Sequence, residues 1–123
     1  MTLAYWMVLV AAMLPYVAVG FAKWRQGYDN HAPRVGYELL PPAKQRAYWA
    51  HLNAFEAFAP FAAAVIIAHL AHAPQSVVDG LAVVFIAARA AHLLLYIKDL
   101  AAWRSVAWAV GITCVIALFV VSA

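Results

Sequence analysis

Polar side chains recur at helical spacing within three of the chain's apolar segments. Residues three, four or seven positions apart lie on one face of an α-helix, so each segment presents its polar groups as a stripe. The residues are Arg46, Asn53 and Glu56 in the second segment, Arg89, His92 and Tyr96 in the third, and Arg104 at the start of the fourth. An ionisable group inside an apolar span costs several kcal/mol, so each of these is a candidate for function.

These side chains share a chemistry that suits a small anionic ligand carrying amides. Guanidinium groups bind carboxylates with paired hydrogen bonds, while Asn and Glu pair with amide and ammonium groups. A structural alternative is an ion pair between Glu56 and Arg89 that only joins their two helices. An aromatic belt at a membrane surface would explain Tyr96 alone. Neither alternative explains why four further polar residues are expected at the same depth, namely Asn53, His92, Tyr96 and Arg104.

The composition indicates that a membrane surrounds the elements carrying these residues. Of the 123 residues, 68% are hydrophobic and 11% are charged, whereas soluble domains have about 25% charged residues. This balance excludes a soluble monomer and a disordered chain. The net charge is +3, but the basic residues form no tract, so no nucleic-acid partner is expected. Cys114 is the single cysteine, which excludes a disulfide framework and a cysteine metal cluster, and no metal site is expected.

The apolar segments predict an all-α integral membrane protein, a bundle of four transmembrane helices in a single domain over residues 1–123. The expected helices cover residues 3–22, 44–72, 75–97 and 101–121. The first has 20 residues without a charge, which is about 30 Å of helix and matches the hydrocarbon core of a bilayer. A polar loop rich in Gly and Pro is expected over residues 23–43.

The basic residues between the helices predict the orientation in the membrane. They are Lys23, Arg25, Arg34, Lys44 and Arg46 around the first connection, and Lys98 and Arg104 around the third. The second connection carries no basic residue. The positive-inside rule therefore places the first and third connections in the cytoplasm and both termini outside.

Two segments resemble the signatures of one family, the MAPEG family of membrane-associated proteins in eicosanoid and glutathione metabolism. The stretch RAYWAHLNAFEAFAPF, residues 46–61, has an arginine followed by Asn-x-x-Glu and Pro-Phe. The stretch ARAAHLLLYIKDLAAWRSVAW, residues 88–108, has Arg-x-x-His-x-x-x-Tyr and a later Arg-Ser. The second stretch is similar to the glutathione transferase and prostaglandin E synthase members. The resemblance covers all four helices, and we expect a bacterial-type member in the inner membrane.

The resemblance implies a homotrimer that binds glutathione between subunits and acts as a transferase or peroxidase on lipophilic electrophiles from the bilayer, with lipids around it. The positions matching glutathione-binding or supporting residues are Arg46, His51, Asn53, Glu56, Arg89, His92 and Tyr96. Arg104 matches an arginine that stabilises the glutathione thiolate, and Ser105 matches an assisting serine. The chain departs from the family pattern at Trp49, where many members have arginine, and at Trp108, where the eicosanoid enzymes have tyrosine.

Two other functions remain as alternatives at the level of sequence. Some members of the family bind lipids without catalysis, so a non-catalytic lipid-binding or scaffold protein is the main rival. A membrane haem protein is the second, because His51 and His92 are expected at similar depth on neighbouring helices. A di-iron carboxylate site is excluded because the chain contains no Glu-x-x-His.

Overall fold

Four long α-helices make up most of the chain in the computed structural model, which describes residues 1–24 and 29–123. The helices are α1 (Leu3–Lys23), α2 (Pro42–Leu70), α3 (Gln75–Ile97) and α4 (Ala101–Val120), and a single 3₁₀ turn, η1 (Tyr37–Leu39), precedes α2. The described residues contain no strand. The predicted all-α, four-helix architecture is confirmed.

The helices begin and end within two residues of the predicted positions, for local reasons. Helix α2 starts at Pro42, earlier than expected, because proline suits the first helical position, where no backbone N–H is required. Helices α2 and α3 both end without glycine: His72 (φ 56°) and Asp99 (φ 62°) adopt the left-handed conformation instead. The amide of the residue after each one reaches back into the helix, with an N–O distance of 3.0 Å in both cases, which is the Schellman pattern.

The connection between α1 and α2 is less polar than predicted. Tyr37 and Leu40 are buried with Ala22 and Ala47 in a small cluster. The Tyr37 ring stacks on Tyr48 of α2 at a centroid distance of 3.9 Å. This connection therefore packs on the bundle through η1.

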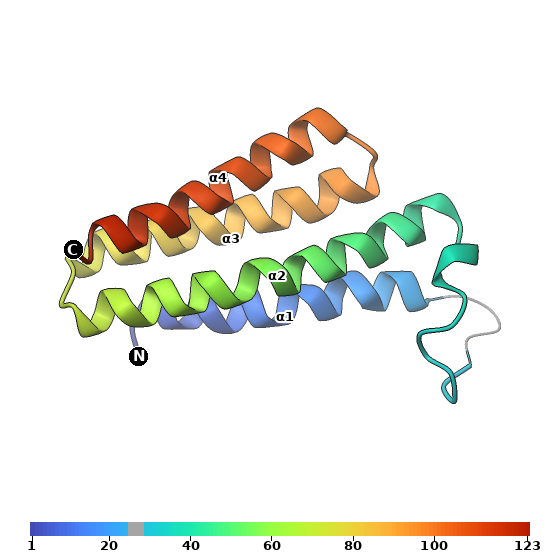
Figure 1. Cartoon of the computed structure of the whole chain (residues 1–123), viewed down its shortest axis with the longest axis horizontal. Helices are drawn as coiled ribbons and strands as arrows, with labels where there is room; N and C mark the ends of the chain where they lie inside the picture. The colour runs from blue at the N-terminus through green and yellow to red at the C-terminus, as the bar shows by residue number, and fades with distance from the viewer. Residues whose placement is uncertain (25–28) are drawn as a thin grey trace.

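The helices form two antiparallel hairpins, α1–α2 and α3–α4, which lie side by side (Figure 1). Alanines fill many of the buried positions, and small residues of this kind allow close helix packing in membranes. The rings of Phe61 and Phe85 stack at 3.8 Å between α2 and α3. Figure 1 shows that α4 diverges from α2 toward the α3–α4 turn.

The chain is an integral multi-pass membrane protein. All four helices are long and apolar enough to span a bilayer, and many large apolar side chains, such as Trp6, Val17 and Ile116, are exposed on the isolated chain. The α1–α2 and α3–α4 connections lie at the same end of the bundle (Figure 1), as the charge pattern requires. Arg25, one of the basic residues in that pattern, lies outside the described residues.

Polar contacts tie the opposite end of the bundle together. Asp79 of α3 accepts hydrogen bonds at Oδ1 from the Ala4 amide (2.7 Å) and from Gln75 Nε2 (2.8 Å). His69 donates from Nδ1 to the Val65 carbonyl at 2.7 Å, which leaves Nε2 to accept from the Thr2 hydroxyl at 2.8 Å. Asp79 thus satisfies an N-terminal amide of α1 from another helix, a position that favours negative charge.

We predict that Asp79→Ala lowers the stability of the bundle. The substitution leaves the Ala4 amide unpaired and removes the favourable charge at the start of α1, at a cost of about 1–2 kcal/mol. Thermal unfolding in mild detergent would show this as a lower midpoint. Glu38→Ala removes an exposed carboxylate and is the control. Equal midpoints for the two variants would contradict the assigned role of Asp79.

Candidate functional site

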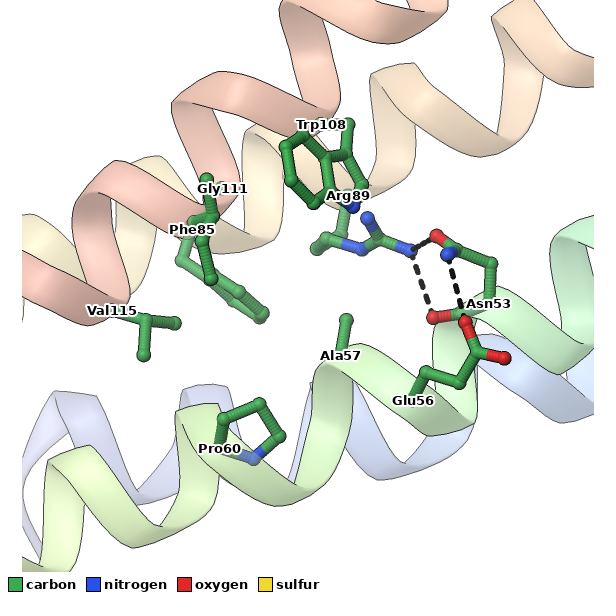
Figure 2. A pocket seen from close by; sticks show the side chains of 10 residues that line it. Asn53, Glu56, Ala57, Pro60, Phe85, Arg89, Trp108, Gly111 and Val115 are labelled. Carbon is green, nitrogen blue, oxygen red and sulfur yellow. Dashed lines mark hydrogen bonds between the residues drawn. The ribbon is translucent and has the colours of Figure 1, made fainter.

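A hydrogen-bonded relay joins α2 and α3 at the centre of the site (Figure 2). Arg89 is 5% exposed, and its Nη2 donates to Asn53 Oδ1 at 2.7 Å and to the Asn53 carbonyl at 3.3 Å. Asn53 Nδ2 donates in turn to Glu56 Oε2 at 3.1 Å. The buried guanidinium is therefore paired with an amide, which itself is oriented by a carboxylate.

The direct Glu56–Arg89 ion pair expected as a structural alternative is absent, because Asn53 lies between the two charges. Only one orientation of the Asn53 amide serves both neighbours, with its oxygen toward Arg89 and its nitrogen toward Glu56. Glu56 is exposed on the isolated chain. Its second carboxylate oxygen receives no hydrogen bond among the described contacts, so Glu56 can accept one from a ligand.

A polar cavity of about 250 Å³ adjoins this relay, and it brings together most of the predicted residues. Its lining consists of Asn53, His92, Tyr96, Arg104, Ser105 and Trp108. The Arg104 guanidinium lies over the Tyr96 ring, 4.3 Å from its centroid, an arrangement that attracts a cation to the ring face. The His92 and Tyr96 rings are nearly perpendicular, with their centroids 5.5 Å apart. Ser105 Oγ donates to the Ala101 carbonyl at 3.1 Å and retains lone pairs that can accept from a ligand.

A second cavity, of about 220 Å³, lies next to the polar one between α2, α3 and α4. Its lining consists of Asn53, Glu56, Ala57, Pro60, Phe85, Arg89, Trp108, Gly111, Ile112 and Val115. Asn53 and Trp108 line both cavities. In Figure 2 the Arg89–Asn53–Glu56 relay lies at one end of this cavity, and Pro60, Phe85 and Val115 lie at the other.

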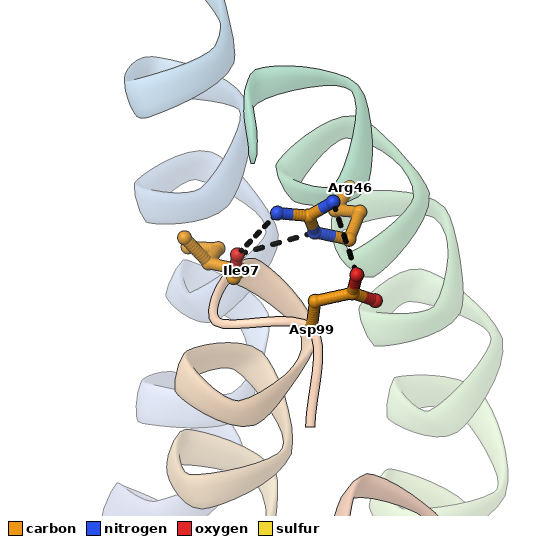
Figure 3. Close-up of polar contacts among 3 residues, drawn as sticks. All are labelled: Arg46, Ile97 and Asp99. Atoms are coloured by element: carbon orange, nitrogen blue, oxygen red, sulfur yellow. Dashed lines mark hydrogen bonds and ion pairs between the residues drawn. The ribbon is translucent and has the colours of Figure 1, made fainter. Parts of the chain in front are cut away.

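Arg46 lies apart from both cavities, at the α3–α4 turn (Figure 3). It donates from Nε and Nη2 to the Ile97 carbonyl at 3.2 and 3.1 Å. Its Nη1 forms an ion pair with Asp99 at 3.6 Å. Arg46 therefore joins the start of α2 to the end of α3. Within one chain it stabilises the turn that leads to Arg104.

His51 faces α1, away from the polar cavity. Its Nδ1 donates to the Pro15 carbonyl at 2.8 Å, and it lines a separate cavity of about 540 Å³ that includes Tyr16, Lys23 and Tyr48. His92 lines the polar cavity instead. Within one chain the two histidines do not face a common space, so the geometry gives no support to a bis-histidine haem site.

Sequence reasoning did not select Trp108, Gly111 or Phe85 as site residues. Each lies one or two helical turns from a predicted residue. Trp108 and Gly111 follow Arg104 by four and seven residues, and Phe85 precedes Arg89 by four. These spacings place them on the same helix faces as the charged residues. That periodicity was the available signal for them.

Four membrane-spanning helices, with charged and polar side chains gathered at one end, define this chain as a membrane protein with a polar cavity at that end. The MAPEG family model matches residues 3–123, so the chain belongs to the MAPEG family. This confirms the resemblance found in the sequence. Comparisons with curated proteins and with solved structures found no match. The family generally binds glutathione, and it includes glutathione-using transferases and peroxidases as well as non-catalytic members.

We predict that Asn53→Leu destabilises the bundle more than Glu56→Gln. Leucine leaves the buried guanidinium without its shortest hydrogen bond, and losing a bond to a charged group costs about 1.5–3 kcal/mol. Glutamine still accepts from Asn53 Nδ2, so the relay persists. Thermal unfolding in mild detergent would compare their midpoints, and the midpoint of Asn53→Leu should be the lower of the two.

The double variant Asn53→Leu/Arg89→Leu is the control for this assignment. It removes the charge together with its partner, so it should be more stable than Asn53→Leu alone. If the loss of stability in the double variant equals the sum of the losses in the two single variants, Asn53 and Arg89 do not depend on one another.

Proposed function

We propose that this chain binds glutathione in the polar cavity and is a transferase or peroxidase acting on lipophilic electrophiles. The observation that carries the proposal is the polar cavity itself, in which Arg104, Ser105 and Tyr96 meet His92 and Asn53. The rival assignment, a non-catalytic lipid-binding or scaffold protein, does not account for so polar a lining inside an apolar bundle.

The donors and acceptors of this region fit the groups of glutathione. The tripeptide carries carboxylates, an ammonium group, amides and a thiol. Arg104 offers a guanidinium for a carboxylate or for the sulfur. Glu56 lines the neighbouring cavity and meets the polar one through its hydrogen bond to Asn53, and its free oxygen suits the ammonium group. His92 and Ser105 supply further polar contacts. Arg89 is paired within the relay and holds Asn53 in place.

Arg104 is the residue we propose for the chemistry. Glutathione supplies the sulfur nucleophile when it is bound. A guanidinium next to a thiol favours its charged form and so lowers the thiol pKa. The Tyr96 ring, 4.3 Å from Arg104, holds the guanidinium at the cavity, and Ser105 places a hydroxyl beside it.

The site is open, which supports a homotrimer in which a neighbouring copy completes it. At about 250 Å³, the polar cavity is smaller than the roughly 300–1,000 Å³ usual for a ligand of drug size. His51 and Lys23, on the α1 side of the chain, would then face a neighbour. On the proposed orientation the cavity opens toward the cytoplasm of a bacterial cell, where glutathione would reach it, and the second substrate would enter from the bilayer.

We predict that the protein is a homotrimer in mild detergent. Polar groups at the edge of the bundle, such as Glu56, need partners that one copy does not supply within the membrane. Native mass measurement would give the number of copies. A monomer or dimer that binds glutathione would contradict a site shared among three subunits.

We predict that Arg104→Lys binds glutathione but raises the pKa of the bound thiol. Lysine keeps a positive charge, which an anchor at a membrane boundary would need, but loses the planar guanidinium. The thiolate absorbance should therefore appear at higher pH, with lower turnover at neutral pH. Calorimetric titration of glutathione and a pH titration of the ultraviolet thiolate band would measure both effects.

Lys98→Arg, at the exposed α3–α4 turn, is the control, since it changes a nearby basic residue outside the cavity. An Arg104→Lys variant with unchanged thiol pKa and turnover would make Arg104 an anchor only. Glutathione binding without any turnover in the unmodified protein would favour the non-catalytic alternative.

A further inference from the structure

The second cavity lies beside the polar one, and we call it the apolar cavity because most of its lining residues are apolar. Its size and lining select a class of second substrate. We propose that it holds the compact apolar group, a single ring or a short alkyl chain, of the molecule joined to the glutathione sulfur. This inference rests on the proposed glutathione site and names the substrate class of that same site.

The position of the cavity supports this occupant. Arg104 lies in the polar cavity, and Trp108, one helical turn further along α4, lines both cavities. A group attached to a sulfur held near Arg104 would pass Trp108 to reach Pro60, Phe85 and Val115. Those side chains offer apolar contact, while the charged relay closes the other end (Figure 2).

The volume limits the occupant to a small group. An apolar cavity of about 150 Å³ holds benzene, and sites for whole drug-sized ligands have roughly 300–1,000 Å³. The cavity here has about 220 Å³. A ring or a short chain fits this space, whereas a long lipid chain does not.

Gly111 keeps the cavity open. A Cβ atom at Gly111 would lie 3.5 Å from Arg89 Cδ and 3.9 Å from the Phe85 ring, which are ordinary contact distances. Helix packing would therefore tolerate alanine, and a glycine inside a helix costs about 1 kcal/mol relative to alanine. Because Gly111 lines the cavity, a side chain longer than alanine at this position would occupy part of its volume.

Binding of S-methylglutathione and S-hexylglutathione by calorimetry tests the proposal without requiring turnover. In the unmodified protein the hexyl compound should bind at least about tenfold more tightly, because burying only two of its five added methylenes, at about 0.8 kcal/mol each, exceeds the roughly 1.4 kcal/mol of a tenfold change. Gly111→Leu should remove this advantage and leave the affinity for S-methylglutathione within about twofold. Gly80→Leu is the matched control, because a Cβ there would meet nothing within 4 Å apart from the backbone of its own helix and its chain neighbours.

Ile112→Phe narrows the same cavity from its exposed rim and replaces Gly111→Leu if that variant fails to fold. Tighter binding of the hexyl compound that persists in a folded variant would overturn the proposal. So would its absence from the unmodified protein, the result expected if a neighbouring copy fills the cavity. Failure of S-methylglutathione and glutathione themselves to bind would instead overturn the proposed function.

Discussion

The buried charge of Arg89 is the constraint on which the arrangement of α2, α3 and α4 depends. Arg89 is 5% exposed, in a bundle whose outer surface meets lipid, and a charged group at this depth is costly unless it has a partner. Asn53 supplies both a side-chain and a backbone oxygen, which fixes the position of α2 along α3. Glu56 is then held at the edge of the site, and the Arg89 stem lies against Gly111 of α4.

Polar contacts at two further depths fix the helices along their axes. Apolar side chains attract each other no more strongly than they attract lipid tails, so they determine poorly how far one membrane helix slides past another. Arg46 binds the end of α3 near the basic end of the bundle, and Asp79 binds the start of α1 at the opposite end. Together with the relay, these contacts position Arg104, Tyr96 and His92 around one cavity.

The sequence predicted the helices and the polar stripes, because length, apolarity and spacing are local properties. It did not predict the hydrogen-bond or ion-pair partner of each polar side chain. Arg46 and Asn53 lie on one helix face, but seven residues separate them by about 10.5 Å along the axis, so they contact different parts of α3. Periodicity likewise did not reveal that Asn53 would separate Glu56 from Arg89, or that His51 would turn toward Pro15. Those outcomes depend on helix rotation and tilt, which packing determines.

One face of α4 divides the site into its polar and apolar parts. Arg104, Trp108, Gly111 and Val115 follow each other at intervals of four, three and four residues, so they form one stripe that runs from the basic end toward the bilayer centre. Charge is tolerated near the end of a span and becomes more costly with depth. A reaction that needs a guanidinium beside sulfur and an apolar pocket beyond it can therefore use a single helix, with the aromatic ring of Trp108 at the boundary between them.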